Sequence, residues 1–232
     1  MHKRNALRGA LFVAASLFAT LVIDVPFASD ASAADAWVKV NDADGITTYR
    51  QKVAGSDVIA FRGEGIIAAP LVRVASVVFD TSRAAEWIDG LAEAKVVRRT
   101  SDLEYVEYDH FKMPFVLSDR DFVTWNHMSY DAAKQTITIS LRSITDPGAP
   151  LTSFTRGELV SSTFVLTPTA DGKSTRVVGD VHCDPRGSIP TWIVNYFQED
   201  WPRTTFKGLR TQVAKANITE NPAIRKLVDG SP

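Results

Sequence analysis

Cysteine is almost absent from this chain of 232 residues, which contains Cys183 alone. A single cysteine cannot form an internal disulfide, so a disulfide-stapled scaffold is excluded. Cys183 lies in a strand-like run, VVGDVHCD, and is predicted to be a buried, unreactive thiol. The alternative, a catalytic cysteine, lacks an arrangement of histidine and asparagine that would activate the thiol.

Motifs for metals, phosphates and nucleic acids are missing as well. The four histidines show no metal-ligand spacing such as H-x-x-x-H, and neither a glycine-rich phosphate loop nor a G-x-S-x-G motif occurs. The net charge is −1, without a basic stripe, so nucleic-acid binding is not indicated. The turn NDADG at 41–45 does not fit a calcium loop, because Val40 and Gln51 would stand where carboxylates are needed. We therefore expect no metal and no cofactor.

One long apolar run is present, and it lies near the N-terminus. A basic start precedes the apolar residues 9–23, and an A-x-A sequence ends at Ala33. The run has the length of a signal-peptide core and is short for a membrane span. We expect residues 1–33 to be a cleaved signal peptide and residues 34–232 to form one exported domain, periplasmic or secreted. A retained N-terminal anchor is the alternative.

Strand and helix patterns predict a single α+β domain. Pro70 suits a first helical turn, and apolar residues then recur at helical spacing, so two short helices are expected at 70–79 and 84–88. Gly63 and Gly65 indicate a bulge or bend in the strand that contains them. The expected strands span residues 46–53, 58–68, 94–99, 103–112, 121–130, 134–144, 157–167 and 174–183. A sheet of this size must curl or pack on something, which predicts a curved antiparallel sheet around a long C-terminal helix.

The C-terminal helix carries many aromatic side chains. Pro190 fits its first turn. Pro202 is expected to kink the helix near Gln198, and Gly208 to weaken it by roughly 1 kcal/mol relative to alanine. Its apolar stripe, at steps of three or four residues, consists of Val194, Phe197, Trp201, Thr205 and Leu209. Such a helix is suited to tilting away from the sheet and covering a cavity; the alternative is a kinked helix on a filled core.

Two motifs resemble those of the StAR-related lipid-transfer (START) domains. Pro114 followed by LSDRDFV at 117–123 is similar to the family's Pro-x-x-x-x-Asp-Arg-Asp-Phe-Val segment. DPRGSIP at 184–190 resembles its Asp-Pro-x-Gly-x-x-Pro, which leads into the last helix. Trp87 in the second short helix and the order of elements agree with the family over about residues 37–216. The resemblance implies a helix-grip fold with a hydrophobic tunnel that holds one lipid, without a cofactor and usually without chemistry.

The resemblance also implies polar residues inside the tunnel. Matching back from Pro114 gives Glu107, and a second inward position gives Asn126, where the steroid-carrying relatives place an arginine. A preference for sterols is therefore not carried over. The full set of expected ligand-binding residues is Trp87, Tyr105, Glu107, Phe122, Thr124, Asn126, Met128, Ile139, Leu141, Val194, Phe197, Trp201, Thr205 and Leu209.

The orientation of Glu107 is open on the residues alone. Tyr105, Glu107 and Asp109 look more polar than Val106 and Tyr108, so period-two alternation by itself favours a solvent-facing Glu107. The family match favours the tunnel, where a carboxyl group would bind a ligand hydroxyl or amine. The neighbouring motif residues Arg120 and Asp121 are expected to be structural, pairing with turn backbone or with each other.

These observations predict a monomeric, non-catalytic carrier. It would bind one lipid, such as a phospholipid, a fatty acid or a sterol-like molecule, and touch membranes transiently. Two alternatives stay open. One is a helix-grip enzyme of cyclase or ring-modifying type, with Glu107 and a histidine as acid and base. The other is a lipid-sensing module whose partner reads the position of the last helix.

Overall fold

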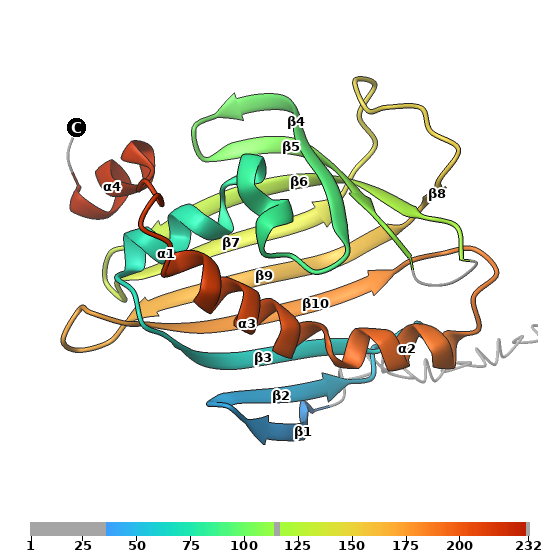
Figure 1. Ribbon diagram of the computed structural model, residues 1–232, viewed down its shortest axis with the longest axis horizontal. Coiled ribbons are helices and arrows are strands. Elements are labelled where there is room, and N and C mark those ends of the chain that lie inside the picture. The colour runs from blue at the N-terminus through green and yellow to red at the C-terminus, as the bar shows by residue number, and fades with distance from the viewer. Residues whose placement is uncertain (1–35, 114–116, 231–232) are drawn as a thin grey trace, which may run out of the picture. The chain divides into compact units, whose positions relative to one another are not determined.

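The computed structural model describes residues 36–113 and 117–230, apart from the side chains of Tyr196 and Phe197. The predicted signal peptide, the motif residue Pro114 and the side chain of Phe197 lie outside this range, and those predictions stay predictions. In the described part, ten strands form one sheet and the helices lie on its concave side (Figure 1).

The strands are β1 (Val38–Ala43), β2 (Ile46–Gln51), β3 (Ala60–Ile67), β4 (Leu91–Ser101), β5 (Glu104–Phe111), β6 (Arg120–Asp131), β7 (Thr136–Ser143), β8 (Thr155–Arg156), β9 (Glu158–Pro168) and β10 (Thr175–Asp184). The helices are α1 (Leu71–Val78), the 3-10 helix η1 (Thr81–Glu86), α2 (Thr191–Glu199), α3 (Trp201–Val213) and α4 (Pro222–Asp229).

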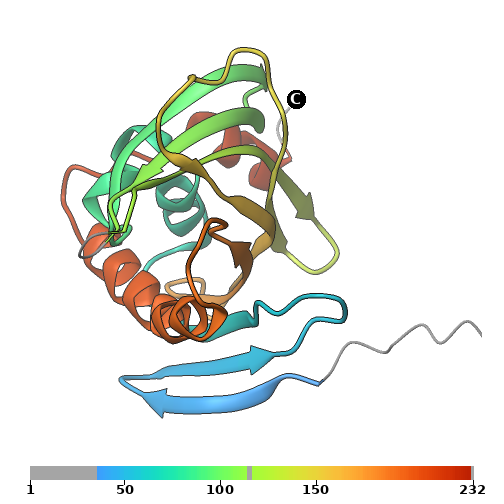
Figure 2. The same ribbon diagram turned by 90° about the vertical axis from the view of Figure 1, so that its right-hand side faces the viewer.

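The sheet is antiparallel and curls around the C-terminal helices. Its strand order is β1-β2-β3-β10-β9-β7-β6-β5-β4, and the short β8 adds a parallel pairing to β6. Figure 2 shows the strands bending from the blue β1–β2 hairpin to the green β4–β5 pair, with α2 and α3 closing the open side of the curl. The predicted α+β helix-grip architecture is confirmed.

Helix α3 packs on a strip of the sheet that has no side chains. A Cβ atom at Gly63 would lie 2.8 Å from Phe206 Cε2 and 2.9 Å from Pro202 Cβ. Phe206 is fully buried there. A bulge or bend was predicted at Gly63 and Gly65; the bulge is wrong, because β3 pairs with β2 and β10 without a register shift. These glycines instead let an aromatic ring rest on the backbone.

The long C-terminal helix is broken into two. Helix α2 ends and α3 begins at Asp200, two residues beyond the predicted kink, and Pro202 occupies the first turn of α3. A proline there lacks only an N–H that has no partner inside the helix anyway. The prediction that Gly208 is a weak point of the helix is also wrong. A Cβ there would lie 2.1 Å from the Trp87 carbonyl oxygen, so Gly208 marks a close contact.

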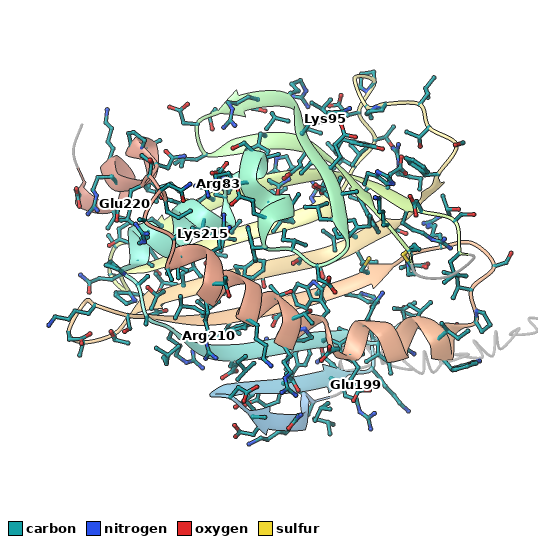
Figure 3. The ribbon with its side chains drawn as sticks, in the orientation of Figure 1. Arg83, Lys95, Glu199, Arg210, Lys215 and Glu220 are labelled. Atoms are coloured by element: carbon teal, nitrogen blue, oxygen red, sulfur yellow. The ribbon has the colours of Figure 1, made fainter. Side chains whose placement is uncertain are left out.

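Several polar contacts fix the C-terminal half of α3. Arg210 donates to the carbonyls of Asp44 and Gly45 in the β1–β2 turn. Lys215 and Arg83 lie close together and both bond to the Glu86 carboxylate (Figure 3). These hydrogen bonds, from Arg83 foremost, hold the pKa of Glu86 well below its usual range. The end of α3 is thereby tied to both the sheet edge and η1.

Three elements escaped the sequence patterns: β1, the two-residue β8 and α4. Strand β1 pairs with β2, although the sequence indicated only a turn there. Helix α4 follows the last predicted element and covers α1: its Ile224 is fully buried, and the Asn221 backbone N–H donates to the Ser76 hydroxyl. Among the described residues, no helix has the length and apolarity needed to span a membrane.

Candidate functional site

The candidate site is the inner face of β5 and β6. Tyr105 marks that face, because its hydroxyl donates to the Phe79 carbonyl and its ring centroid lies 4.7 Å from that of Phe79, at the end of α1. Across the strand pair, Tyr105 is opposite Asn126 and Glu107 is opposite Thr124. Opposed residues share a face, so all four side chains point toward the helices.

The outer face of the same strands is also covered. Val106, Tyr108 and Val123 form a small buried cluster against Ile144 and Ala149 of the β7–β8 segment. Because the outer face is covered, its side chains are apolar, and the alternation of polarity along β5 wrongly indicates that Glu107 faces solvent. Glu107 faces inward and is only 7% exposed, whereas the more apolar side chains face out beneath a loop.

Glu107 has a second carboxyl group beside it. Asp109, two residues along β5, lies on the same face and opposite Phe122. Burial raises the pKa of Glu107 to about 7, while Thr81, Asp109 and Arg99 act in the opposite direction. Burial and the Glu107 charge raise the pKa of Asp109 well above its usual range. Near neutral pH the pair therefore retains a proton that exposed carboxylates would lose.

Asn126 and Thr124 continue the polar surface on β6. The Asn126 amide nitrogen donates to the Thr124 hydroxyl at 3.0 Å and to its carbonyl at 3.3 Å. With its N–H groups engaged, Asn126 presents its carbonyl oxygen as an acceptor. The Trp87 indole nitrogen and the Thr81 hydroxyl are buried without a hydrogen-bond partner in the described part of the chain. Unpaired buried donors of this kind need a partner, such as water or a ligand.

Several predicted site residues lie in a closely packed part of the interior. They belong to the main core cluster with Phe206 and Val177, or lie buried beside it. These residues are Trp87, Met128, Ile139, Thr205 and Leu209. The structure places them together, next to Tyr105, and a role in ligand binding stays a prediction for them.

Other inner-face residues keep accessible surface. Leu141 and Trp201, both predicted, are half-buried at the edge of the main cluster. Asp109 and Cys183, neither of them in the predicted set, are half-buried too. Burial nevertheless raises the pKa of the Cys183 thiol to about 12, so this accessible surface lies deep in the protein. The predicted full burial of Cys183 is wrong, because its burial is intermediate, and the raised pKa of the thiol is in keeping with the prediction of low reactivity.

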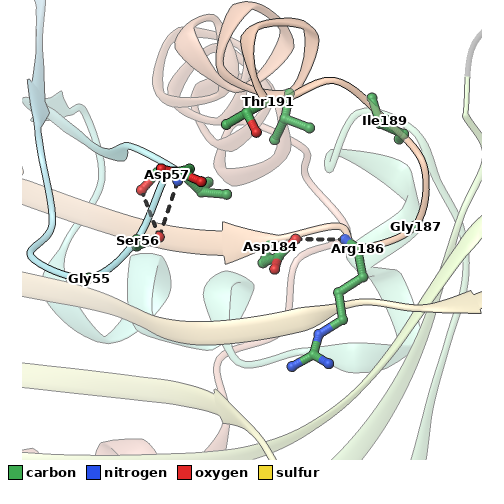
Figure 4. A pocket seen from close by; sticks show the side chains of 10 residues that line it. Gly55, Ser56, Asp57, Asp184, Arg186, Gly187, Ile189 and Thr191 are labelled. Carbon is green, nitrogen blue, oxygen red and sulfur yellow. Dashed lines mark hydrogen bonds between the residues drawn. The ribbon is translucent and has the colours of Figure 1, made fainter.

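A cavity of about 480 Å³ lies beside the start of α2. Figure 4 shows its two sides, the β2–β3 loop with Ser56 and Asp57, and the β10–α2 loop with Asp184 and Arg186. Val194, a predicted site residue, lines it from α2. The other predicted stripe residues of α3 are not among its lining residues.

Helix α2 is held in place by two side chains. Asn195 accepts a hydrogen bond from the Ile59 backbone N–H at 3.1 Å. Gln198 donates to the Cys183 carbonyl at 2.8 Å. The Gln198 carbonyl oxygen is buried without a partner among the described residues. Among the described side chains of α2, Asn195 and Gln198 are the ones that hydrogen-bond to the strands and to the β2–β3 loop.

The motif residues Arg120 and Asp121 brace the loops around this end of the sheet. Arg120 is buried and donates to the carbonyls of Ser118, Pro185 and Arg186, which joins the β5–β6 and β10–α2 loops. Asp121 accepts hydrogen bonds from Arg156 and Thr152. The expected contact of Arg120 with turn backbone is confirmed, whereas Asp121 pairs with Arg156 and not with Arg120.

The histidines do not join the site. His110 bonds to Asp119 at 2.8 Å and stacks on Phe154, and His182 bonds to Ser56 at 3.1 Å. His127 stacks on Trp125. By strand alternation these side chains lie on the opposite face from Glu107 and Asn126. Over residues 36–113 and 117–230, no group of His, Cys, Asp or Glu is arranged to hold a metal ion.

Two known proteins are similar to this chain in sequence. An uncharacterized protein of Pseudomonas aeruginosa is 30% identical, over 78% of this chain and 89% of its own length. The phosphatidylcholine transfer protein of Mus musculus is 28% identical, over 69% of this chain and 75% of its own.

Solved structures of StAR-related lipid transfer proteins have a similar fold. A StAR-related lipid transfer protein from Xanthomonas axonopodis has a TM-score of 0.69 and 28% identity, over 78% of this chain and 100% of the solved fragment. Human StAR-related lipid transfer protein 5 shares the fold, with a TM-score of 0.71 at 20% identity, over 76% of this chain and 86% of its own. The START domain model matches residues 23–217, so the chain belongs to the START domain family.

Proposed function

We propose that the protein binds one lipid between its curved sheet and helix α2 and carries it between membranes. The observation that supports this most directly is the inner face around Glu107. Its polar side chains point into the protein, and Asp109, Leu141 and Cys183 there keep accessible surface. The printed names of two relatives, a StAR-related lipid transfer protein and a phosphatidylcholine transfer protein, point the same way.

The physical purpose of such a carrier is to remove apolar surface from water. A lipid crossing water exposes several hundred Å² of hydrocarbon, at about 25 cal/mol for each Å². Enclosing the acyl chain beside Leu141 and Trp201 removes that cost. The protein then lowers the barrier to transfer without any chemical step.

Helix α2 is the element that we expect to move. It meets α3 at a break at Asp200 and is held to the sheet by Asn195 and Gln198. The cavity beside its first turn provides room for displacement. Helix α3 stays in place because Phe206 and Arg210 fix it to the sheet and the β1–β2 turn.

Membrane contact and export complete the proposal. Trp192 on α2 is 72% exposed, and Leu151 in the β7–β8 loop is fully exposed. Exposed aromatic and aliphatic side chains of this kind suit brief insertion at a membrane interface. With the N-terminal apolar run, they favour a carrier that works outside the cytoplasm and touches membranes transiently.

The enzymatic alternative is less well supported. It requires a histidine near Glu107, and the three described histidines, His110, His127 and His182, lie on the other face of the sheet. The carrier function is therefore the one that the geometry favours.

The test is to purify the protein, extract it with organic solvent and identify any lipid by mass spectrometry. We expect one bound lipid per chain and transfer of fluorescent lipid between vesicles. Asn195→Ala should accelerate transfer severalfold, because it removes the hydrogen bonds of α2 to Ile59 and Asp57. Thr211→Ala, on the exposed face of α3, is the matched control and should leave the rate unchanged. Protein that carries no lipid and transfers none would contradict the proposal.

A further inference from the structure

One level of the sheet's inner face is closely packed across neighbouring strands. Residues opposite one another on adjacent strands lie at the same level, which here contains Met128, Ile139, Phe164, Gly179 and Gly63. Met128 is 2% exposed, Ile139 1% and Phe164 6%. The two glycines have no side chain, so this level would be open over β10 and β3 unless another element filled it.

Phe206 of α3 fills that opening. A Cβ atom at Gly63 would lie 2.8 Å from Phe206 Cε2, and one at Gly179 would lie 3.7 Å from the same atom. The Cβ position at Gly179 is also 3.1 Å from Phe164 Cε1, so both phenyl rings lie over this glycine. Phe206 is fully buried. A continuous row of side chains, called here the inner wall, therefore crosses the concave side of the sheet; it consists of Met128, Ile139, Phe164 and Phe206.

Accessible surface begins one step beyond the inner wall. Leu141 is the next inner-face position after Ile139 on β7, and it is half-buried. Cys183, further along β10, is half-buried as well. The half-buried ring of Trp201 packs on Phe164, with the two ring centroids 6.3 Å apart. The space that a ligand tail could occupy therefore ends at the inner wall.

Contacts on both sides of Phe206 hold the inner wall in place. Pro202, in the first turn of α3, has its Cβ atom 2.9 Å from the position that a Cβ atom of Gly63 would take. Further along the helix, Arg210 donates to the Asp44 carbonyl. Phe206 lies between these two contacts, so movement of α2 alone leaves it seated on the sheet. A ligand tail then meets a boundary of constant position.

The span in front of the inner wall matches the length of a membrane-lipid tail. Met128 and Phe122 both face inward and are six residues apart on β6, about 20 Å at roughly 3.4 Å for each residue. The hydrocarbon of one bilayer leaflet is about 15 Å thick, half of a core of about 30 Å. A tail of that length can extend from Phe122 toward the wall but cannot pass it.

We propose that Phe206 is a specificity-determining residue, which sets the maximum length of the ligand's apolar tail by closing the inner wall. This inference rests on the proposed lipid-binding function and adds a limit to its ligand class: lipids are accepted up to one tail length, whatever their polar group. Leu209, one turn further along α3 and fully buried, then supports the wall without touching the ligand.

The test measures how long a tail the purified protein accepts. Two series of single-tail lipids are offered from dioleoylphosphatidylcholine vesicles: saturated alcohols from dodecanol to tetracosanol, and lysophosphatidylcholines with the same chains. Bound lipid is quantified by mass spectrometry. Partition from vesicles cancels the general gain for each methylene group, because the tail lies in hydrocarbon in both states. We expect constant partition up to a limit, and about a tenfold fall for two further methylene groups that cannot enter.

Two substitutions should move this limit in opposite directions. Phe206→Leu trims the side chain at the wall and should raise the limit by about two carbon atoms. Leu141→Phe fills the first accessible position in front of the wall and should lower the limit by a similar amount. Should Phe206→Leu fail to fold, Phe164→Leu trims the same wall from β9 and takes its place.

Ile224→Ala is the matched control. Ile224 is as fully buried as Phe206, but it lies on α4, which packs on α1 and not on the inner wall. The control variant should lower the urea midpoint, because a core side chain is truncated, and leave the length limit unchanged.

The outcomes separate the two proposals. Partition without a limit in the series that bind, a limit that stays the same when the wall is trimmed, or a limit that shifts equally in Ile224→Ala would overturn the role of Phe206 and leave lipid binding intact. If no member of either series binds, the proposed carrier function fails and this inference fails with it.

Discussion

The two ends of the sheet's inner face differ in how completely side chains fill them. Under α3, glycines such as Gly63 receive the buried ring of Phe206, and Leu209 beside it is fully buried. At the other end, Asp109 and Leu141 keep accessible surface, and the described hydrogen bonds of α2 to the β2–β3 segment and to β10 come from Asn195 and Gln198. One end is thus closely packed, and the other is the end where we propose that the ligand binds.

The sharpest way to test the packed end is Phe206→Ala. Removing a fully buried ring that rests on glycine backbone should cost about 3 to 5 kcal/mol of unfolding free energy, measured by urea denaturation. Trp192→Ala, a change of similar size at a 72% exposed position, should shift stability by less than about 0.5 kcal/mol. Equal losses for the two variants would remove the distinction between the ends.

Gly208→Ala probes the same end from the other helix face. Alanine in a helix is normally more stable than glycine by about 1 kcal/mol. Here the added methyl group meets the Trp87 carbonyl at 2.1 Å, so we expect a loss of about 2 to 3 kcal/mol in thermal or urea denaturation. A gain in stability would show that α3 is not pressed against Trp87.

Glu107→Gln probes the open end through pH. The folded-state pKa of Glu107, about 7, lies above its value in an unfolded chain. The folded protein then binds more protons, so this group makes stability fall as pH rises from about 4 to 7, by about 3 kcal/mol.

The variant should therefore show a shallower loss between pH 5 and pH 8 in urea midpoints. Glu104→Gln, on the other face of β5, should keep the wild-type slope. An unchanged slope in Glu107→Gln would mean that water hydrates the carboxylate as well as in an unfolded chain.

Leu141→Ala should have the smallest effect on stability. Because Leu141 is half-buried, its truncation should cost about 1 kcal/mol, while lipid affinity falls about tenfold from lost hydrocarbon contact. Ser140→Ala, on the opposite face of β7, should change neither quantity. A stability loss as large as that of Phe206→Ala would place Leu141 in the packed end.

Local signals in the sequence were sufficient to predict most of the helices, strands and turns. Pro70 and Pro190 each precede a helix, and Gly172, with φ of +65°, lies in the tight turn between β9 and β10. These features depend on a few neighbouring residues, which is why they can be predicted. The roles of Gly63 and Gly208 could not be, because each depends on a side chain or carbonyl far away in the chain.

The candidate site shows the same limit. The family motif gave Glu107 and Asn126, and the structure places both on one face. Alternation of polarity indicated the wrong face for Glu107, because Ile144 and Ala149 cover the outer side of β5. Asp109 shares the period of Tyr105 and Glu107 and was missed, although extending the same alternation by one step would have found it.

The break at Asp200 separates the movement of α2 from the global stability of the fold, which a continuous helix would couple. If α2 and α3 formed one continuous helix, moving it away from the sheet would also expose Phe206. Each such movement would then approach global unfolding. Because the helix is divided, we expect substitutions at Asn195 or Gln198 to change how often the proposed ligand exchanges, while the melting temperature stays nearly constant.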